Sequence, residues 1–303
     1  MKLSIERMLR ADGLDPAAVE RIARTALEED LGPDLLDVTS AATIPAGQVG
    51  TGHLVARADG VVAGLVVAAV VFDLVADLPA GREGEGAGHG SVDVVFQVRD
   101  GVRVRRGEVL ATVTGPTRSL LTAERTALNL LCRMSGVATH TRAWADALDG
   151  TKTQVLDTRK TTPGLRMLEK YAVRAGGGTN KRMGLYDVAM IKDNHKRAAG
   201  GITAAYRRIR QAFPQVPVQV EVTNLAEAVE AVEAGADFLL CDNMALSLLG
   251  RVVTTIGDRA ELEATGGLTL ERAAEYAATG VDYLSVGALT HSSPILDIAL
   301  DLR

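Results

Sequence analysis

Aromatic residues are scarce in this chain, at 3% of its 303 residues. Without them a protein lacks the stacking platforms on which most single-strand nucleic-acid binders hold bases. The formal net charge of −5 also lacks the positive excess that attracts a polyanion. We therefore expect no nucleic-acid partner, and a core built from Val, Leu, Ile and Ala.

Cysteine is nearly absent, since Cys132 and Cys241 lie far apart in apolar runs without metal-ligand spacing. Both are predicted to be buried reduced thiols, which suits a reducing cytoplasm. No apolar segment of signal-peptide length opens the chain. The longest apolar stretch, residues 60–78, is interrupted by Asp73 and Asp77, so it predicts a buried helix or strand pair. We expect a cytoplasmic protein without a membrane partner.

The first 120 residues show no regular alternation of helix and strand. Asp15 caps a predicted helix, Pro16 occupies its first turn and Gly32 follows its end. Residues 119–148 predict one or two further helices, beginning "SLLTAERTALNLLCRM". This half of the chain therefore predicts a mixed domain rather than a repeating one.

Two glycine-containing segments lie between these helices. Residues 79–91 lack the strand that leads into a phosphate-binding loop, so a flexible connector is predicted there. Residues 92–115 alternate as β structure and resemble a lipoyl-type hairpin. They contain no lysine to carry such a group, which favours a structural β layer.

After residue 150 apolar β-like runs recur, each followed by a helix pattern. The last four of their polar ends are spaced by 21, 23 and 22 residues, one βα unit each. This alternation favours a parallel sheet covered by helices, as a closed or nearly closed α/β barrel, with an open doubly wound sheet as the alternative. The polar ends are Asp157, Lys192, Glu221, Asp242, Thr265 and Gly287.

Cations gather at the first of these strand ends. Arg159 and Lys160 follow one apolar strand directly, and Lys192 follows the next. In a parallel barrel the carboxyl ends of the strands meet at one mouth, so these side chains are expected to point inward. Because like charges are costly to bury together, the pattern predicts an anionic ligand.

Carboxylates and glycines end the later strands. Glu221 and Asp242 are placed at adjacent strand ends, where oxygen ligands beside a phosphate suit Mg²⁺. "ATGGLT" and "SVGALT" place glycine turns after the last two strands, the common phosphate position in such barrels. We expect a phosphate-bearing substrate.

Several longer motifs resemble the quinolinate phosphoribosyltransferases, the carboxylating nicotinate-nucleotide pyrophosphorylases of NAD biosynthesis. The resemblance covers residue 20 to the C-terminus, in order and at similar spacing. The motifs are "LLTAERTALNLLCRMSGVAT", "LDTRKTTPGLRMLEKYAVRAGGGTNKRMGLYD", "MIKDNH", "VEVTNLAEA", "LLCDNM" and "EATGGL".

The resemblance implies an N-terminal α/β sandwich over residues 1–128, on which a C-terminal segment of about 290–303 packs. Residues 129–289 would then form an incomplete, open α/β barrel. It also implies a homodimer in which Arg125 reaches the active site of the partner. The implied reaction is phosphoribosyl transfer from phosphoribosyl pyrophosphate to quinolinate with decarboxylation.

Residue roles carry over with the motifs. Arg125, Arg159 and Arg182 would bind the two carboxylates of quinolinate, with Lys192 also at the site. Thr158 and Lys160 would lie beside them, with Lys160 meeting the pyrophosphate. The resemblance implies that the catalytic residues are Lys160, Lys192, Glu221 and Asp242. Of these, Glu221 and Asp242 would hold the ribose hydroxyls and Mg²⁺. The residues that would bind the 5′-phosphate are Thr265, Gly266, Gly267, Val286, Gly287 and Ala288.

This chain departs from the family where Lys181-Arg182 replaces the common His-Arg. Lysine keeps a positive charge but does not titrate near neutral pH as histidine does. We expect Lys181 to bind substrate through its charge alone. The family also includes paralogues linked to molybdenum transport, whose substrates differ.

Two functions from other classes fit part of the pattern. A Schiff-base aldolase would use Lys192 as its nucleophile, but it leaves the arginines and glycine turns without a purpose. A phosphate-ligand sensor would use the same pocket without catalysis. Borohydride would trap a covalent adduct of an aldolase but not of a phosphoribosyltransferase. A sensor would release no pyrophosphate, whereas a phosphoribosyltransferase would.

Overall fold

The structure, a computed structural model, describes residues 1–78 and 89–303. The predicted connector at 79–91 lies mostly outside them. The chain divides into two compact units: residues 1–140, 162–177 and 293–303 form the first, and residues 141–161 and 178–292 the second. The predicted boundary at 128 falls inside helix α5 (Thr117–Ala147), which continues beyond it without a break.

The first unit contains a four-stranded antiparallel sheet in the order β12-β1-β5-β3. The predicted β layer at 92–115 is confirmed, and the C-terminal strand pairs with β1 at the sheet edge. Two further short strands, β2 and β4, pair with each other as a separate antiparallel ribbon. The strands are β1 (Val49–Ala56), β2 (Gly60–Val61), β3 (Asp93–Phe96), β4 (Arg103–Val104), β5 (Val109–Pro116) and β12 (Ile298–Leu302).

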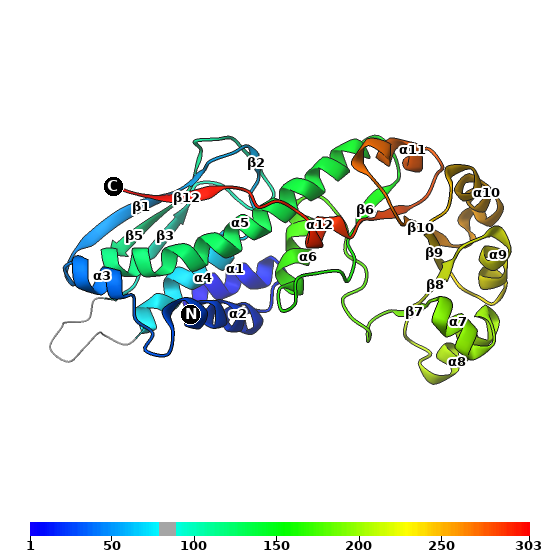
Figure 1. Cartoon of the computed structure of the whole chain (residues 1–303), viewed down its shortest axis with the longest axis horizontal. Coiled ribbons are helices and arrows are strands. Elements are labelled where there is room, and N and C mark those ends of the chain that lie inside the picture. The colour runs from blue at the N-terminus through cyan, green and yellow to red at the C-terminus, as the bar shows by residue number, and fades with distance from the viewer. Residues whose placement is uncertain (79–88) are drawn as a thin grey trace. The chain divides into compact units, whose positions relative to one another are not determined.

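Helices α1, α2 and α4 lie on one side of this sheet (Figure 1). As predicted, Asp15 caps α2, accepting a hydrogen bond from the backbone of Ala17, and Gly32 ends the helix with φ of 68°. The apolar stretch at 60–78 forms α4, which is buried along nearly its whole length. The helices of this unit are α1 (Leu3–Ala11), α2 (Pro16–Leu31), α3 (Val38–Thr43), α4 (Leu65–Leu74), the 3-10 turn η1 (Val75–Asp77), α5 and α6 (Arg166–Ala175).

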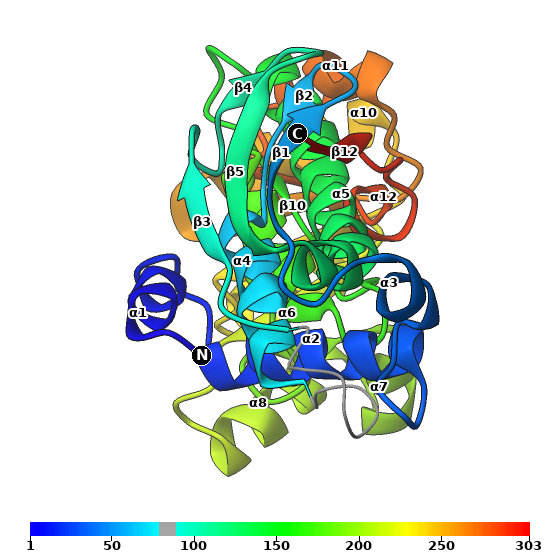
Figure 2. The ribbon, with the colours of Figure 1, turned by 90° about the vertical axis from the view of Figure 1, so that its left-hand side faces the viewer.

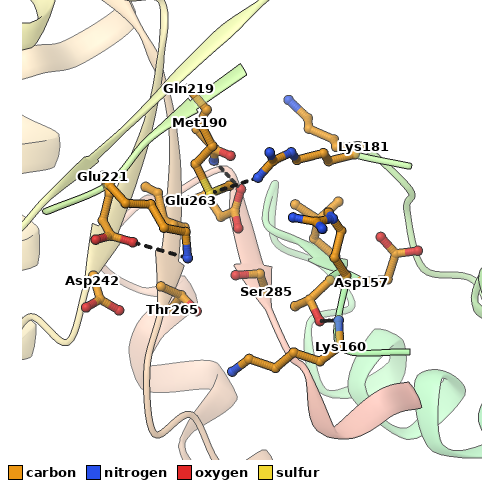
Figure 3. A pocket seen from close by; sticks show the side chains of 16 residues that line it. Asp157, Lys160, Lys181, Met190, Gln219, Glu221, Asp242, Glu263, Thr265 and Ser285 are labelled. Carbon is orange, nitrogen blue, oxygen red and sulfur yellow. Dashed lines mark hydrogen bonds and ion pairs between the residues drawn. The ribbon is translucent and has the colours of Figure 1, made fainter. Parts of the chain in front are cut away.

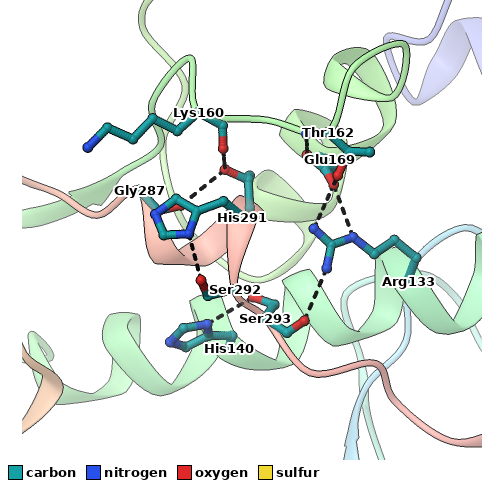
Figure 4. A network of polar contacts seen from close by, with 10 residues as sticks. Arg133, His140, Lys160, Thr162, Glu169, Gly287, His291, Ser292 and Ser293 are labelled. Atoms are coloured by element: carbon teal, nitrogen blue, oxygen red, sulfur yellow. Dashed lines mark hydrogen bonds and ion pairs between the residues drawn. The ribbon is translucent and has the colours of Figure 1, made fainter.

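A buried ion pair fixes α6 against α5. The Nη2 atom of Arg133 lies 2.7 Å from Oε1 of Glu169, whose side chain is fully buried. The backbone N–H and the hydroxyl of Thr162 donate to the same carboxylate, at 2.9 and 2.7 Å (Figure 4). Each charge is therefore both paired and hydrogen-bonded, as burial requires. These bonds explain why 162–177 belongs to the first unit although it follows β6.

The second unit is a six-stranded parallel sheet in the order β6-β11-β10-β9-β8-β7. Strands β7 to β11 are neighbours in chain order, without the reversal that a doubly wound sheet contains. β6 and β7 lie at opposite edges and do not pair, so the predicted open α/β barrel is confirmed. The strands are β6 (Gln154–Leu156), β7 (Ala189–Ile191), β8 (Val218–Val222), β9 (Phe238–Asp242), β10 (Glu261–Thr265) and β11 (Tyr283–Ser285).

Helices follow these parallel strands and cover the outside of the curved sheet (Figure 1), whereas Figure 2 shows the antiparallel sheet of the first unit from in front. Cys132 in α5 and Cys241 in β9 are both buried free thiols, as predicted. No helix in the described part of the chain has the length and apolarity that a membrane crossing needs. The outer helices are α7 (Asp193–Ala199), α8 (Ile202–Ala212), α9 (Leu225–Glu233), α10 (Leu246–Ile256), α11 (Ala273–Ala277) and α12 (Ala288–His291), with 3-10 turns η2 (Gly257–Arg259) and η3 (Leu270–Arg272).

Candidate active site

The carboxyl ends of the six parallel strands surround one cavity of about 380 Å³. Its wall combines the predicted cations with the predicted carboxylates, because alternate residues of each strand face the concave side of the sheet. Among the predicted site residues, the cavity is lined by Thr158, Arg159, Lys160, Lys181, Arg182, Lys192, Glu221, Asp242 and Thr265.

The carboxylates lie on two adjacent strands. Glu221 is on β8 and Asp242 is the last residue of β9. The Glu221 side chain is 13% exposed, and its Oε2 lies 3.8 Å from Nζ of Lys192. Asp242 accepts a hydrogen bond from the Asn243 side chain at 3.0 Å. Figure 3 shows both carboxylates at the same side of the cavity.

The cations approach from the loops that follow β6 and precede β7. Arg182 donates from Nε to the Gly184 carbonyl at 3.0 Å. Burial, followed by the nearby positive charge of Arg159, lowers the pKa of Arg182. An arginine keeps its proton at neutral pH regardless. Arg159 and Arg182 both line the cavity, and two positive charges close enough to repel each other favour an anion bound beside them.

The glycine turns lie beside the cavity without appearing in its wall. Gly266 and Gly267 adopt φ of 94° and 59°, a region that favours glycine. A Cβ atom on Gly266 would lie only 2.2 Å from Oδ1 of Asn243. The predicted helix beginning at Thr269 is reduced to η3 and the five-residue α11. The second predicted turn, Val286-Gly287-Ala288, joins β11 to the short helix α12.

Three further polar residues of the cavity were missed by the sequence analysis. Gln219, Glu263 and Ser285 line it from β8, β10 and β11. Gln219 and Glu263 come two residues before Glu221 and Thr265, so each pair shares a strand face. The two-residue spacing from Glu221 and Thr265 could have indicated that Gln219 and Glu263 face the cavity. Composition alone does not distinguish such polar residues from the rest of a short apolar strand.

Lys181 lines the cavity, but its ammonium group is held at the first residues of three strands. Its ammonium nitrogen lies 3.9 Å from the centroid of the Phe238 ring and 4.1 Å from that of Tyr283. It also forms an ion pair with Glu261. Phe238, Glu261 and Tyr283 are the first residues of β9, β10 and β11, whereas the predicted carboxylate and phosphate positions on these strands lie at or after their last residues. These contacts give Lys181 a structural role in joining β9, β10 and β11. Its contact with substrate stays a prediction.

This position leads to a testable expectation for Lys181→Met. Loss of two cation–π contacts should lower the free energy of unfolding by about 1 to 2 kcal/mol. The KM for substrate should change by less than about threefold, because the ammonium is engaged at the first residues of the strands, not at the carboxyl ends where Asp242 and Thr265 lie. Urea unfolding and steady-state kinetics measure the two effects, with Lys181→Arg as the charge-retaining control. A large rise in KM with unchanged stability would instead support the predicted substrate contact.

Arg125 belongs to α5 in the first unit and is exposed there. The residues that line the cavity all belong to the second unit. The structure contains one chain, so the predicted contact of Arg125 with a partner stays a prediction.

Two family descriptions match nearly the whole chain. "Quinolinate phosphoribosyl transferase, N-terminal domain" matches residues 37–135, and the corresponding C-terminal domain matches residues 137–301. The chain belongs to the quinolinate phosphoribosyl transferase family. The predicted resemblance is thereby confirmed.

Individual members of this family are similar over nearly their full length. The nicotinate-nucleotide pyrophosphorylase [carboxylating] of Mycobacterium leprae is 50% identical over 282 residues, covering 92% of this chain and 95% of that protein. A probable nicotinate-nucleotide pyrophosphorylase [carboxylating] of Bacillus subtilis is 41% identical, covering 90% of each. The solved nicotinate-nucleotide pyrophosphorylase of Francisella tularensis is 33% identical, with a TM-score of 0.87 and coverage of 95% and 96%.

Proposed function

We infer that this protein transfers the phosphoribosyl group of phosphoribosyl pyrophosphate to quinolinate, with loss of CO₂. The products are nicotinate mononucleotide and pyrophosphate, a step of NAD biosynthesis. The observation that carries this inference is the single cavity whose wall contains both Arg159 and Arg182 and the carboxylates Glu221 and Asp242. A substrate pair with carboxylates and phosphates matches this division of charge. Neither the aldolase nor the sensor hypothesis accounts for family membership together with the two arginines.

The dicarboxylate is assigned to the cations on the loops that follow β6 and precede β7. Arg159 and Arg182 present planar guanidinium groups, which bind carboxylates through paired hydrogen bonds. Lys192 adds a charge from the end of β7, and Thr158 lies on the same loop as Arg159. Binding orients the pyridine nitrogen toward the sugar, which converts a bimolecular reaction into an effectively unimolecular one.

The phosphoribosyl group is assigned to the remaining strand ends. Lys160 meets the pyrophosphate, and its backbone N–H is fixed by the Thr158 hydroxyl at 3.0 Å. Glu221 and Asp242 accept hydrogen bonds from the ribose hydroxyls. The 5′-phosphate is assigned to Thr265, Gly266, Gly267, Val286, Gly287 and Ala288.

The donor set also fits Mg²⁺. Two carboxylates at neighbouring strand ends suffice, because Mg²⁺ keeps several waters and takes its other ligands from substrate phosphates. The described residues contain no group of three or more His, Cys, Asp or Glu side chains that could form an all-protein metal site. When bound by Glu221 and Asp242, Mg²⁺ would neutralise charge on the pyrophosphate.

The reaction then follows from the chemistry of the ring. The pyridine nitrogen donates its lone pair to the anomeric carbon as the bond to pyrophosphate breaks. Lys160 stabilises the negative charge that grows on the leaving pyrophosphate. Alkylation makes the ring nitrogen positive, and this charge stabilises the electron pair left behind when the neighbouring carboxylate departs as CO₂.

Substrate choice tests this proposal. Quinolinate should be turned over at least about 100-fold more efficiently than nicotinate, which lacks the second carboxylate and leaves a half-buried arginine without its substrate partner. The measurement is a coupled pyrophosphate-release assay with both acids and a control without acid. Similar kcat/KM values for both acids would contradict the assignment of Arg159 and Arg182. No pyrophosphate release with quinolinate would contradict the proposed function itself.

A further inference from the structure

Decarboxylation requires a proton donor, and none of the residues assigned so far supplies the proton. This reasoning rests on the proposed function. When the C–C bond breaks, CO₂ leaves without the bonding electron pair, which stays on the ring carbon beside the positive nitrogen. The product carries hydrogen at that carbon, so one proton has to be supplied. Until it arrives, the same carbon can recapture CO₂. A proton donor inside the cavity would therefore make the step irreversible.

Glu263 is a buried carboxyl group in the wall of this cavity. The residue is 6% exposed and lies in the middle of β10, on the same strand face as Thr265. The Nε2 atom of Gln219 donates to its Oε2 at 2.6 Å, and Ser285 forms a second hydrogen bond. Figure 3 shows Glu263 between these two residues. Its orientation is thus fixed from β8 and β11.

The surroundings of Glu263 shift its pKa upward. Burial raises its pKa, and the negative charge of Asp157 adds to this effect. Two hydrogen bonds and the positive charge of Lys181 oppose it. A bound dicarboxylate brings further negative charge, which disfavours ionisation of Glu263.

We propose that Glu263 is the general acid that protonates the ring carbon vacated by CO₂. The O–H bond of the carboxyl group breaks, the electron pair on the ring carbon forms the new C–H bond, and Glu263 becomes a carboxylate. This carboxylate faces the positively charged pyridinium product. It regains a proton from water after the product leaves. A carboxylic acid is a stronger acid than the ammonium groups of the cavity, which are also needed to hold the substrates.

Glu263→Gln tests the proposal, because glutamine keeps the shape of the side chain but has no acidic proton. In a single turnover of the wild type, pyrophosphate and CO₂ should appear together. In the variant, pyrophosphate should still form, while CO₂ release should be slower by about tenfold or more. The N-ribosylated dicarboxylate should accumulate. Rapid quenching with quinolinate labelled in the carboxylate next to nitrogen measures CO₂ and the N-ribosylated dicarboxylate, and phosphoribosyl pyrophosphate labelled in its pyrophosphate group measures pyrophosphate.

Glu233→Gln on the exposed end of α9 is the matched control and should behave as the wild type. Equal loss of both products in Glu263→Gln, or loss of neither, would overturn the general-acid role while leaving the proposed function intact. If Glu263→Gln does not fold, the wild type in D₂O provides the test. CO₂ release should then slow about twofold or more without a change in pyrophosphate release. Equal rates of CO₂ release in both solvents would overturn the proposal.

Discussion

Lys160→Ala should release pyrophosphate about 10²- to 10³-fold more slowly than the wild type. A preorganised charge beside the leaving group acts mainly in the transition state, and its removal typically has an effect of this size. Lys160 lies on the loop after β6, and within the described residues it makes no ion pair that would have to be broken first. Figure 3 shows its side chain extending along the cavity on the side of Thr265 and Asp242. Pre-steady-state pyrophosphate release measures the effect.

Lys152→Ala is the matched control for this experiment. Lys152 precedes β6, and its Nζ pairs with Asp282 at 2.9 Å on the surface. A surface pair of this kind contributes about 1 kcal/mol or less to stability, so the control should fold and react normally. If Lys160→Ala reacts at the control rate, Lys160 does not stabilise the transition state.

Mixing two inactive proteins should restore activity if Arg125 acts across a dimer. Arg125→Ala and Lys160→Ala homodimers should each lose nearly all activity, because every site lacks one group. In a heterodimer one site combines Arg125 of one subunit with Lys160 of the other and is complete. Random exchange should therefore recover about a quarter of the wild-type sites, since half of the dimers are mixed and each has one intact site.

Two tags on the subunits allow the heterodimer to be purified and its activity measured directly. Mixing wild type with Lys160→Ala provides the control, because one site of each mixed dimer is then intact whichever subunit supplies Arg125. An inactive heterodimer of the two variants, with an active control dimer, would place Arg125 and Lys160 in the same subunit's site.

The strand ends could be read from the sequence because apolar runs of the second unit stop at charged or glycine residues. Glu221 and Asp242 illustrate this, since the regular spacing of βα units was enough to predict that they lie at adjacent strand ends. The open barrel was predictable mainly from the family resemblance. Composition and periodicity alone left a doubly wound sheet as an alternative.

Other features depend on contacts that sequence patterns do not contain. Lys181 looked like one more cation of the site, yet Phe238 and Tyr283, which are far away in sequence, hold its ammonium group. Glu263 lies within a short strand, where its burial and its bond to Gln219 arise only through folding. The length of α5 was also hidden, because helix patterns do not predict whether adjoining segments continue as one helix.

An incomplete barrel has two open sides, at which backbone groups can bind a strand from another molecule. In this protein both outer strands, β6 and β7, are only three residues long, and the outer edge of β6 already pairs with Thr179. Lys192 follows β7 directly, which places a charge where an added strand would continue. A template of three residues offers few hydrogen bonds, and short charged edges are a known protection against aggregation. The barrel can therefore stay open to substrates without becoming a nucleus for polymerisation.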